Sequence, residues 1–432
     1  MPAGMPVAVC FPATTKEVAA VVGVAVAHRV PVVTRGAGSG LAGAANAVEG
    51  CIVLSTTRMN AILAIDDVDQ QAIVQPGVLN GALKAAARVQ GMDYPPDPAS
   101  FEFSTIGGNI ATNAGGLCCV KYGVTRDYVL GLEVVLADGN ILRTGRRTSK
   151  GVAGYDLTSL IVGSEGTLGV VTEATLRLRA STAHAPSTAV ASFASLEAAG
   201  VAVVSIMRSG VMPSLLELMD QTTIRAVESW QRMELDTDAA ALLLVQSDQR
   251  GAEAAADIEV VTKLCAAAGA DNVIGTSDPE EGLMLLAARR FAYPALERLG
   301  ATLLDDVAVP RRRIPELLTG INGISRANDV TIGTFGHAGD GNFHPTVVYG
   351  HDDAVRRASA LASFDSIVRL ALSLGGTVSG EHGIGLLKRR HLALELDGPA
   401  VTVHHAIKRA LDPLGIFNPG KALPATAGES AS

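Results

Sequence analysis

The sequence predicts an α+β fold. Over roughly the first 180 residues, glycine-rich turns separate short predicted strands with few helices between them. From residue 194 to residue 327 predicted helices alternate with predicted strands, as in two strand–helix–strand units that share a ferredoxin-like sheet. Because this alternation does not run through the whole chain, an α/β fold is disfavoured.

The chain opens with a helix and a short buried strand. Thr14 and Glu17 have the spacing of a capping box, which predicts a helix that ends near His28. Residues 31–34 are predicted to form a strand that leads directly into a glycine-rich loop at residues 35–43. The backbone amides of such a loop can surround a phosphate.

This loop contains a dinucleotide-binding pattern in an unusual place. Gly38, Gly40 and Gly43 match G-x-G-x-x-G, the fingerprint of Rossmann units. Only residues 44–50 separate the loop from the next predicted strand, at 51–55, which leaves no room for a crossover helix. The loop therefore suits a pyrophosphate outside a Rossmann unit, with a plain surface turn as the alternative.

A second glycine-rich region begins at Pro96. Residues 104–116 are polar, dense in glycine and nearly uncharged, which favours backbone that wraps a large ligand. Asp138-Gly139 lies between two apolar runs and predicts a hairpin. Other elements expected in this part are a helix at 79–89 and strands at 72–74, 132–137, 141–144 and 170–178, the last one after a glycine-rich turn at 163–169.

A domain boundary is expected near residues 181–187, where the glycine-rich loops stop. Arg311-Arg312-Arg313 is expected to be the solvated start of a helix. Beyond the boundary we expect helices at 194–208, 251–268, 279–293, 314–327, 352–374 and 401–411, and strands at 240–246, 272–274 and 302–309.

Two histidines flank a predicted hairpin turn. Strands are expected at residues 330–335 and 343–349, so His337 and His344 lie at the two ends of the turn between them. Glu381 lies downstream with glycines on both sides, in Ser-Gly-Glu-His-Gly. Two histidines and one carboxylate are a common ligand set for zinc, manganese or ferrous iron. The alternative is that the histidines only form hydrogen bonds at the turn.

The composition argues against several classes of function. The net charge is −8 with no dense basic cluster, which disfavours nucleic acid as a partner. No run approaches the ~18 apolar residues of a membrane span, and no basic start followed by an apolar block indicates a signal peptide. The five cysteines show no metal-binding or disulfide spacing. We therefore expect a cytoplasmic protein in a reducing compartment.

Several segments occur in an order that resembles a known family. They are residues 35–43, 96–116, 163–169, 337–344, 380–385 and 418–421. Together they resemble the FAD-linked oxidases of the vanillyl-alcohol oxidase / p-cresol methylhydroxylase superfamily. His-Ala-Gly-Asp-Gly-Asn-Phe-His followed by Gly-Glu-His-Gly resembles most closely the branch of D-2-hydroxy-acid dehydrogenases, which includes the glycolate oxidase flavoprotein subunit, cytochrome-type D-lactate dehydrogenase and D-2-hydroxyglutarate dehydrogenase.

The resemblance implies a two-part FAD-binding domain of p-cresol methylhydroxylase type and a ferredoxin-like α+β cap. Residues 1–180 would bind FAD, and residues 181–400 would form the cap or substrate domain with the metal site. Residues 401–432 would return to the FAD-binding domain, with a disordered tail from Pro424. The N-terminus is shorter than this family leads us to expect.

The resemblance also implies roles for individual residues. His337, His344 and Glu381 match the metal ligands, His382 the catalytic base, and Arg289 the arginine that binds the substrate carboxylate. FAD would be held non-covalently, since residues 35–43 contain no histidine for attachment. The FAD-binding set is Arg35, Gly36, Ala37, Gly38, Ser39, Gly40, Leu41, Gly43, Pro96, Asp97, Ser104, Thr105, Gly107, Gly108, Asn109, Ala111, Asn113, Glu165, Gly166, Gly169, Val170 and Asn418.

The implied reaction is oxidation of a small D-2-hydroxy acid to the 2-oxo acid. Hydride would go to flavin N5 and the hydroxyl proton to His382, while a divalent cation, zinc before manganese or ferrous iron, polarises the hydroxyl. Hydroxyglutarate-type relatives carry a lysine where this chain has Leu304, and Asp305 and Asp306 would repel a second carboxylate, so glycolate or D-lactate is expected. The electron acceptor would be a quinone, a cytochrome, an electron-transfer protein or a partner subunit, in a homodimer or a larger oxidase. Through such a partner the cytoplasmic protein could lie peripherally at a membrane.

Three alternatives remain open at this stage. The chain could be a flavin-binding subunit without chemistry of its own, a D-2-hydroxyglutarate-type dehydrogenase, or a non-redox flavoenzyme of ether-lipid synthesis from the same superfamily. A flavin-binding subunit would need the glycine loops but not His337, His344, Glu381 and His382, all of which are present.

Overall fold

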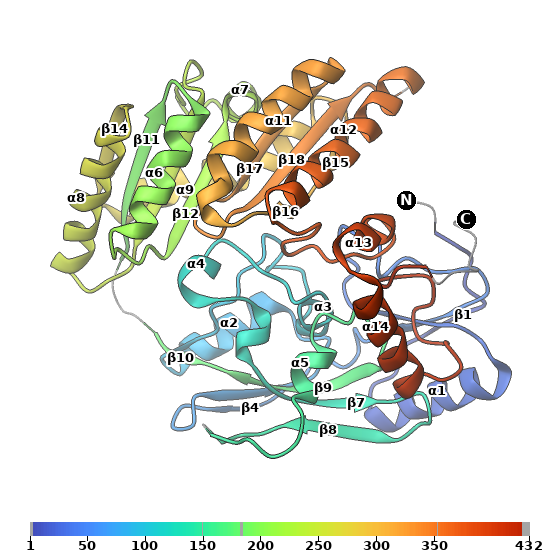
Figure 1. Cartoon of the computed structure of the whole chain (residues 1–432). Coiled ribbons are helices and arrows are strands. Elements are labelled where there is room, and N and C mark those ends of the chain that lie inside the picture. The colour runs from blue at the N-terminus through green and yellow to red at the C-terminus, as the bar shows by residue number, and fades with distance from the viewer. Residues whose placement is uncertain (1–2, 149, 182–184, 352, 426–432) are drawn as a thin grey trace. The chain divides into compact units, whose positions relative to one another are not determined.

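The computed structural model describes residues 3–148, 150–181, 185–351 and 353–425. The chain forms two compact units (Figure 1). Unit 1 comprises Met1–Gly116, Gly123–Ser181 and Glu381–Ser432, and unit 2 comprises Leu117–Tyr122 and Thr182–Gly380. The sequence placed the domain boundaries at residues 181 and 401, and the assignment of FAD binding to the first part and of a cap to the second stays a prediction.

Unit 1 contains the elements of both ends of the chain. In chain order they are β1 (Ala8–Cys10), α1 (Thr15–His28), β2 (Val32–Arg35), β3 (Ile52–Ser55), β4 (Ile62–Asp66), β5 (Gln71–Val74), α2 (Asn80–Val89), β6 (Met92–Asp93), α3 (Ile106–Thr112), η1 (Thr125–Tyr128), β7 (Val129–Val135), β8 (Ile141–Gly145), α5 (Leu157–Ile161), β9 (Val170–Arg177), β10 (Arg179–Ala180), α13 (Arg389–Glu395) and α14 (Gly398–Leu411).

Two sheets organise unit 1. Strands β1, β3 and β2 form a parallel sheet, and β4, β5, β9, β7 and β8 form an antiparallel one. Strands β2 and β3 are parallel neighbours, yet no helix is assigned to the described residues 36–51 that connect them. The prediction that this glycine loop lies outside a Rossmann unit is therefore confirmed.

Helix α1 begins and packs as its sequence predicts. The Thr14 hydroxyl accepts a hydrogen bond from the amide of Glu17 at 3.2 Å, and the Glu17 carboxylate accepts one from the amide of Ala13 at 2.7 Å. Val18, Val22 and Ala25 are fully buried, in a core cluster that also contains residues of β2 and β3. Their spacing of four and three residues places them on one face of the helix.

The second glycine-rich region contains a helix that was not predicted. Within residues 104–116, α3 occupies seven positions. Thr105 caps this helix by accepting from the Gly108 amide at 3.2 Å, and Asn113 ends it in the left-handed region at φ 52°. The cap and the left-handed end stabilise a helix that the glycine content disfavours.

The predicted hairpin at Asp138-Gly139 is confirmed. Strands β7 and β8 pair antiparallel on either side of it, with Val135 opposite Ile141. Gly139 has a φ of +81°, which residues with a side chain rarely adopt.

Unit 2 begins with a short helix and continues with alternating strands and helices. Its elements are α4 (Cys119–Tyr122), β11 (Ser187–Phe193), α6 (Leu196–Arg208), β12 (Leu215–Asp220), α7 (Gln221–Gln231), β13 (Ala241–Ser247), α8 (Ala252–Ala267), β14 (Ala270–Thr276), α9 (Pro279–Arg290), α10 (Ala292–Glu297), β15 (Ala301–Leu304), β16 (Val307–Ala308), η2 (Arg311–Arg313), α11 (Ile314–Asn328), β17 (Thr331–His337), β18 (Asn342–Tyr349) and α12 (Ala354–Ser373).

An eight-stranded antiparallel sheet runs through the described part of unit 2. Its order begins β14-β11-β13-β12, in which α6 joins β11 to β12 and α8 joins β13 to β14, as in a ferredoxin-like fold. The same sheet continues through β17, β18 and β15. Figure 1 shows α8, α6, α11 and α12 across one face and α7 and α9 behind the sheet. The predicted ferredoxin-like architecture is confirmed and extended by a second set of strands.

Three expectations for unit 2 are corrected. The strand expected at 302–309 is interrupted at Asp305 and Asp306, which are fully buried between β15 and β16. The Asp305 carboxylate accepts a hydrogen bond from the amide of the next residue at 2.8 Å, a local contact that competes with regular strand pairing. The Asp306 carboxylate instead accepts from the Ser379 hydroxyl. The helix expected at 279–293 ends at Arg290 and a separate helix begins at Ala292. Arg311 is not only solvated, because its Nε donates to the carbonyl of Gly339 at 2.6 Å.

The stability of the fold should depend on pH through Asp220, which ends β12 and caps α7. Its carboxylate accepts from the Thr223 amide at 2.8 Å, and burial raises its pKa from 3.8 to about 6. The folded state therefore binds the proton more tightly, so this contribution to stability is full below about pH 4 and is lost as the pH rises through about 6. Asp220→Asn keeps a capping oxygen and should be more stable than wild type at pH 7 by roughly 2 kcal/mol.

Melting temperatures of both proteins at pH 4.5 and pH 7 would check this expectation. The advantage of Asp220→Asn should shrink at the lower pH. A difference that stays constant between the two values would show that Asp220 does not titrate in this range.

Candidate functional site

The histidine hairpin is present as predicted. Strands β17 and β18 pair antiparallel with His337 opposite Asn342 and Phe335 opposite His344. Gly341 in the turn has a φ of +76°, and a Cβ there would lie 2.3 Å from the carbonyl oxygen of Val309. The turn therefore requires glycine at this position.

This register brings the two histidine side chains together. Because Asn342 lies opposite His337 and side chains alternate along a strand, His344 projects from the same face as His337. Both residues are buried, and their ring centroids are 5.2 Å apart in an edge-to-face arrangement. A ring nitrogen of each lies within 4.8 Å of one of the other, close enough for both to bind one ion.

Each histidine also faces a carboxylate. The Nδ1 atom of His337 lies 2.7 Å from Glu217 Oε1, and that of His344 lies 3.8 Å from Asp306 Oδ1. Asp306 is held in turn by the hydroxyl of Ser379, which donates to Oδ2 at 2.7 Å. In metal sites a carboxylate at one ring nitrogen fixes the tautomer and leaves the other nitrogen for the ion. The two histidines thus have surroundings that fit a metal-binding role.

Arg289 lies beside this pair, in the last turn of α9. Only 6% of the residue is exposed, and its Nε lies 2.7 Å from Glu217 Oε2. Its guanidinium also lies over the ring of Phe335, 4.8 Å from the centroid. Glu217 is therefore shared between Arg289 and His337.

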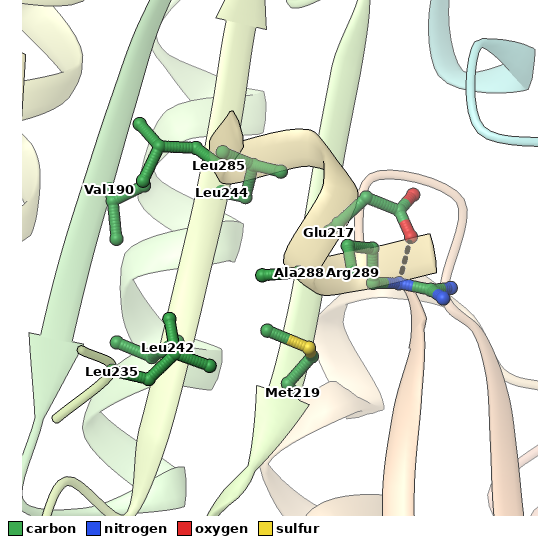
Figure 2. A pocket seen from close by; sticks show the side chains of 9 residues that line it. All are labelled: Val190, Glu217, Met219, Leu235, Leu242, Leu244, Leu285, Ala288 and Arg289. Carbon is green, nitrogen blue, oxygen red and sulfur yellow. Dashed lines mark ion pairs between the residues drawn. The ribbon is translucent and has the colours of Figure 1, made fainter. Parts of the chain in front are cut away.

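A small apolar cavity of about 20 Å³, room for about one water molecule, adjoins this ion pair. Figure 2 shows Glu217 and Arg289 meeting at one end of it and the aliphatic side chains at the other. The lining residues are Val190, Glu217, Met219, Leu235, Leu242, Leu244, Leu285, Ala288 and Arg289.

Glu217 was not among the site residues predicted from the sequence, and the position of Asp306 next to His344 was not predicted either. A signal for Glu217 exists, since it interrupts the apolar run Leu215-Leu216-Glu217-Leu218-Met219 of β12. A carboxylate in such a run must be paired, because an unpaired buried charge is costly.

The Gly-Glu-His-Gly segment spans the division between the units. Gly380 ends unit 2, where a Cβ on it would lie 2.4 Å from the side chain of Asn342. Glu381 begins unit 1, and its Oε2 lies 2.5 Å from the position that a Cβ would take on Gly115. His382 Nε2 lies 3.9 Å from Glu381 Oε1. Within unit 2 the structure brings His337, His344 and Arg289 together, and the participation of Glu381 and His382 in the same centre stays a prediction.

Glu165 holds the backbone that follows His382. Its two carboxylate oxygens accept hydrogen bonds from the amides of Ile384 at 2.7 Å and Gly385 at 2.8 Å. Burial raises the pKa of this carboxyl, and the two amide hydrogen bonds oppose that rise. The side chain of Glu165 thus fixes this stretch of backbone, and its part in FAD binding stays a prediction.

The first glycine loop of unit 1 lies against the start of α3. A Cβ on Gly36 would lie 2.2 Å from the Thr105 hydroxyl oxygen, so a larger residue does not fit. Gly38 has a φ of +73° and lies under the guanidinium of Arg35, whose Nη1 donates to the carbonyl of Ala45 at 3.2 Å. A Cβ on Gly40, in contrast, would meet no protein atom within 4 Å. The loop thus combines close approaches on one side with open space at Gly40.

Polar side chains join the segments of the second glycine-rich region. The buried Asn80 donates to the carbonyl of Pro96 at 3.2 Å and to Asn109 Oδ1 at 3.0 Å. Asn109 donates to the Ser104 hydroxyl at 3.2 Å, and Asn113 Oδ1 accepts from the Arg126 amide at 2.9 Å. These side chains hold the backbone around α3 in one arrangement.

The remaining predicted FAD-binding residues fall into two groups. Some support the chain: the Ala111 carbonyl accepts from the Glu165 amide at 2.8 Å, a Cβ on Gly107 would lie 2.6 Å from Pro76, and a Cβ on Gly169 would lie 2.6 Å from Val134. Gly108 lies within α3, and Val170 is the first residue of β9 and is buried in a core cluster. The others lie on loops, namely Ala37, Ser39, Leu41, Gly43, Asp97 and Gly166.

The C-terminal segment returns to the first glycine loop within unit 1. Asn418 is buried and donates to the carbonyls of Ala44 at 3.0 Å and Glu165 at 2.7 Å. Lys421 donates to the Ala44 carbonyl at 2.8 Å, and burial lowers its pKa to about 8. Asn418 is thus placed next to both predicted FAD-binding loops by its own hydrogen bonds.

Among the described residues, none of the helices has both the length and the apolar character that crossing a bilayer requires.

Two family models match the chain. The model of the C-terminal domain of FAD linked oxidases matches residues 183–422, and the model of an FAD binding domain matches residues 6–145. The first of these covers more than half of the chain.

Curated relatives match over nearly the full length. The glycolate oxidase subunit GlcD of Bacillus subtilis (strain 168) is 43% identical over 96% of this chain and 89% of its own length. The D-lactate dehydrogenase of Anaerostipes hadrus is 36% identical over 94% of this chain and 87% of its own.

The solved structures agree on the fold. A structure of p-cresol methylhydroxylase with substrate bound has a TM-score of 0.81 at 18% identity, and it matches over 98% of this chain and 90% of its own. A 4-ethylphenol oxidase from Gulosibacter chungangensis has a TM-score of 0.79 at 19% identity, over 96% and 89%. The expected fold of p-cresol methylhydroxylase type is confirmed. The chain belongs to the FAD-linked oxidases and is an FAD-linked oxidoreductase.

Proposed function

We propose that this oxidoreductase converts a small D-2-hydroxy acid, glycolate or D-lactate, to the 2-oxo acid. The observation that carries the proposal is the buried group formed by Arg289, Glu217, His337 and His344 in unit 2. An arginine, which can bind a carboxylate, lies there beside two histidines whose surroundings fit metal binding, and this supports the proposal. The names of the relatives, a glycolate oxidase subunit and a D-lactate dehydrogenase, support the same substrate class.

The loops of unit 1 fit the binding of FAD. Backbone amides around Gly38 and Gly40 would hold the pyrophosphate, and open space at the Gly40 Cβ position leaves room for it. The polar group around Asn109 and the C-terminal Asn418 would line the flavin. When bound, the flavin accepts the hydride of the substrate. The absence of histidine from residues 35–43 supports non-covalent attachment.

The donor set fits a divalent cation. His337 and His344 would supply two nitrogens and Glu381 a carboxylate oxygen, a set that suits zinc, with manganese or ferrous iron as alternatives. The carboxylates of Glu217 and Asp306 at the Nδ1 atoms support the use of both Nε2 atoms. When bound, the cation lowers the pKa of the substrate hydroxyl.

The remaining steps belong to side chains of the chain itself. Arg289 would bind the substrate carboxylate with two parallel hydrogen bonds, since Glu217 engages its Nε and leaves the terminal nitrogens for a ligand. His382 would take the hydroxyl proton, as histidines do near neutral pH. The amides that bind Glu165 fix the backbone two and three residues after His382, which supports a fixed position for this base.

Selection of a small acid follows from the segment after α10. Leu304 offers no positive charge to a second carboxylate. Asp305 and Asp306 are fully buried, and Asp306 Oδ1 lies 3.8 Å from His344 Nδ1. These three residues favour a monocarboxylic acid over D-2-hydroxyglutarate or D-malate. A cytoplasmic protein that passes its electrons to a quinone, a cytochrome, an electron-transfer protein or a partner subunit, as a homodimer or within a larger oxidase, completes the proposal.

Replacement of Gly40 by leucine should abolish FAD binding, because the side chain would fill the space that the pyrophosphate needs. The measurement is the ratio of flavin to protein absorbance after purification, with acid treatment of wild type expected to release the flavin. Gly23→Leu is the matched control, since Gly23 is exposed on α1 in the same unit and a Cβ there meets nothing within 4 Å. Equal flavin content in the two variants would refute the loop assignment.

Removal of the metal should stop reduction of the flavin by substrate while FAD stays bound, and added zinc or manganese should restore the reduction. Stopped-flow absorbance and metal analysis provide the readouts. Normal flavin reduction in the chelated, metal-free enzyme would assign His337 and His344 a structural role.

Replacement of the proposed base, His382→Asn, should retain both metal and FAD but slow flavin reduction by about 10²-fold or more. The same two measurements apply. Normal flavin reduction in this variant would exclude His382 as the base.

The proposed carboxylate clamp, Arg289, can be tested through the preference for substrates. Glycolate or D-lactate should reduce the flavin faster than D-2-hydroxyglutarate or D-malate, under anaerobic conditions at equal concentration. Arg289→Ala should raise KM for the preferred acid strongly, with a smaller fall in kcat if the clamp acts mainly in ground-state binding. Faster reduction by a dicarboxylic acid would show that the assignment of Leu304 is wrong.

A further inference from the structure

Glu217 makes two short contacts with two different partners. Its Oε1 lies 2.7 Å from His337 Nδ1, and its Oε2 lies 2.7 Å from Arg289 Nε. The side chain is 1% exposed, so water does not compete for either oxygen. One carboxylate therefore orients a group on β17 and a group on α9 at the same time.

The position of Glu217 is fixed by the sheet. Leu218 pairs with Gly336 and Met219 with Phe335, and one step further in this register Glu217 lies opposite His337. Facing side chains on adjacent antiparallel strands lie close enough to interact directly. On the other side of β12, Glu217 pairs with Leu244 of β13, so the strand has a sheet neighbour on each side. Strand pairing, and not a mobile loop, holds the carboxylate between its two partners.

Arg289 is also held by an aromatic ring, in addition to its contact with Glu217. Its guanidinium lies between Glu217 and the ring of Phe335, and Phe335 pairs across the hairpin with His344. The Phe335 and His344 rings are 5.4 Å apart. Both histidines and the arginine are thus linked through Glu217 on one side and Phe335 on the other.

We infer that Glu217 is a positioning residue that orients the metal ligand His337 and the carboxylate clamp Arg289 together. This inference rests on the proposed function, because it takes those two roles as given. The side chain of Glu217 would then set both the affinity for the metal and the affinity for the substrate carboxylate. A carboxylate behind a metal-binding histidine typically contributes 10–100-fold to metal affinity. An arginine held by a buried carboxylate cannot turn away from its ligand.

The alternative is that Glu217 only neutralises a buried arginine. In that case Glu217→Gln would lower the melting temperature, and any effect on substrate would come through Arg289 alone. Metal affinity would stay at the wild-type value. Zinc binding to the chelated flavoprotein, measured by calorimetry without substrate, is therefore the readout that a merely structural role does not move.

The experiment compares Glu217→Gln with Asp220→Asn and Arg289→Ala in the holoprotein with bound FAD. Asp220 is the matched control, since it is a buried carboxylate on the same strand whose side chain caps α7. Glu217→Gln should weaken zinc binding by 10–100-fold and raise KM for glycolate or D-lactate, whichever reduces the wild-type flavin faster, by at least about tenfold. Asp220→Asn should change both by less than about twofold, and Arg289→Ala should change KM without a matching loss of zinc affinity.

The conservative variant keeps the test valid if Glu217→Gln does not fold. Glu217→Asp retains the charge on a side chain that is shorter by one methylene group. Zinc affinity should therefore fall less, and KM should rise less, than in Glu217→Gln. Unchanged zinc affinity, or unchanged KM, in a folded Glu217 variant overturns the inference while the proposed function stands. Wild-type protein that binds no zinc, or whose flavin neither acid reduces, overturns the proposed function and the inference with it.

Discussion

Buried charge that must find a partner is the constraint on which the candidate site depends. Within unit 2, Glu217, Asp305, Asp306 and Arg289 are each at most 6% exposed. An ion in such surroundings costs several kcal/mol unless another charge or several hydrogen bonds compensate it. The arrangement of Arg289 against Glu217, and of Asp306 against Ser379 and His344, answers that requirement. Each contact that lowers this cost also fixes the direction of a side chain that the proposed reaction needs.

The same principle organises unit 1 with different groups. There the half-buried Lys408, the buried Lys421 and the side-chain amide of Asn418 donate to backbone carbonyls. The Asp412 carboxylate accepts from the amides of Ile416 and Phe417. These bonds attach the C-terminal segment to the first glycine loop and to the carbonyl of Thr167. Loops with few apolar side chains cannot be held by packing, so hydrogen bonds to their backbone carbonyls take over that task. Removal of the C-terminal segment would leave carbonyls of both loops without these donors.

The sequence predicted the parts of the structure that local patterns determine. Thr14 and Glu17 located the start of α1, Asp138-Gly139 located a hairpin, and the two histidines located the β17–β18 turn. Helix α3 was missed because three of its residues, Gly107, Gly108 and Asn109, disfavour helices, while its cap and its left-handed end decide the outcome. Glu217 was missed because its partners lie 72 and 120 residues away in sequence. A contact of that kind depends on strand order, which no local pattern reports.

Formal charge gives a physical reason for a cation at the hairpin. Glu217, Asp305 and Asp306 are buried carboxylates on or beside the strands that pair with this hairpin, and Arg289 is paired with one of them. His337 and His344 are neutral when they act as ligands. A divalent ion between the histidines would offset the negative charge that Arg289 leaves uncompensated. A second carboxylate on the substrate would add negative charge again, in surroundings where charge is poorly screened. Under the proposed function, the residues that favour the metal would be the same ones that disfavour a dicarboxylic acid. The proposed metal and the proposed preference for a small monocarboxylic acid thus have one electrostatic basis.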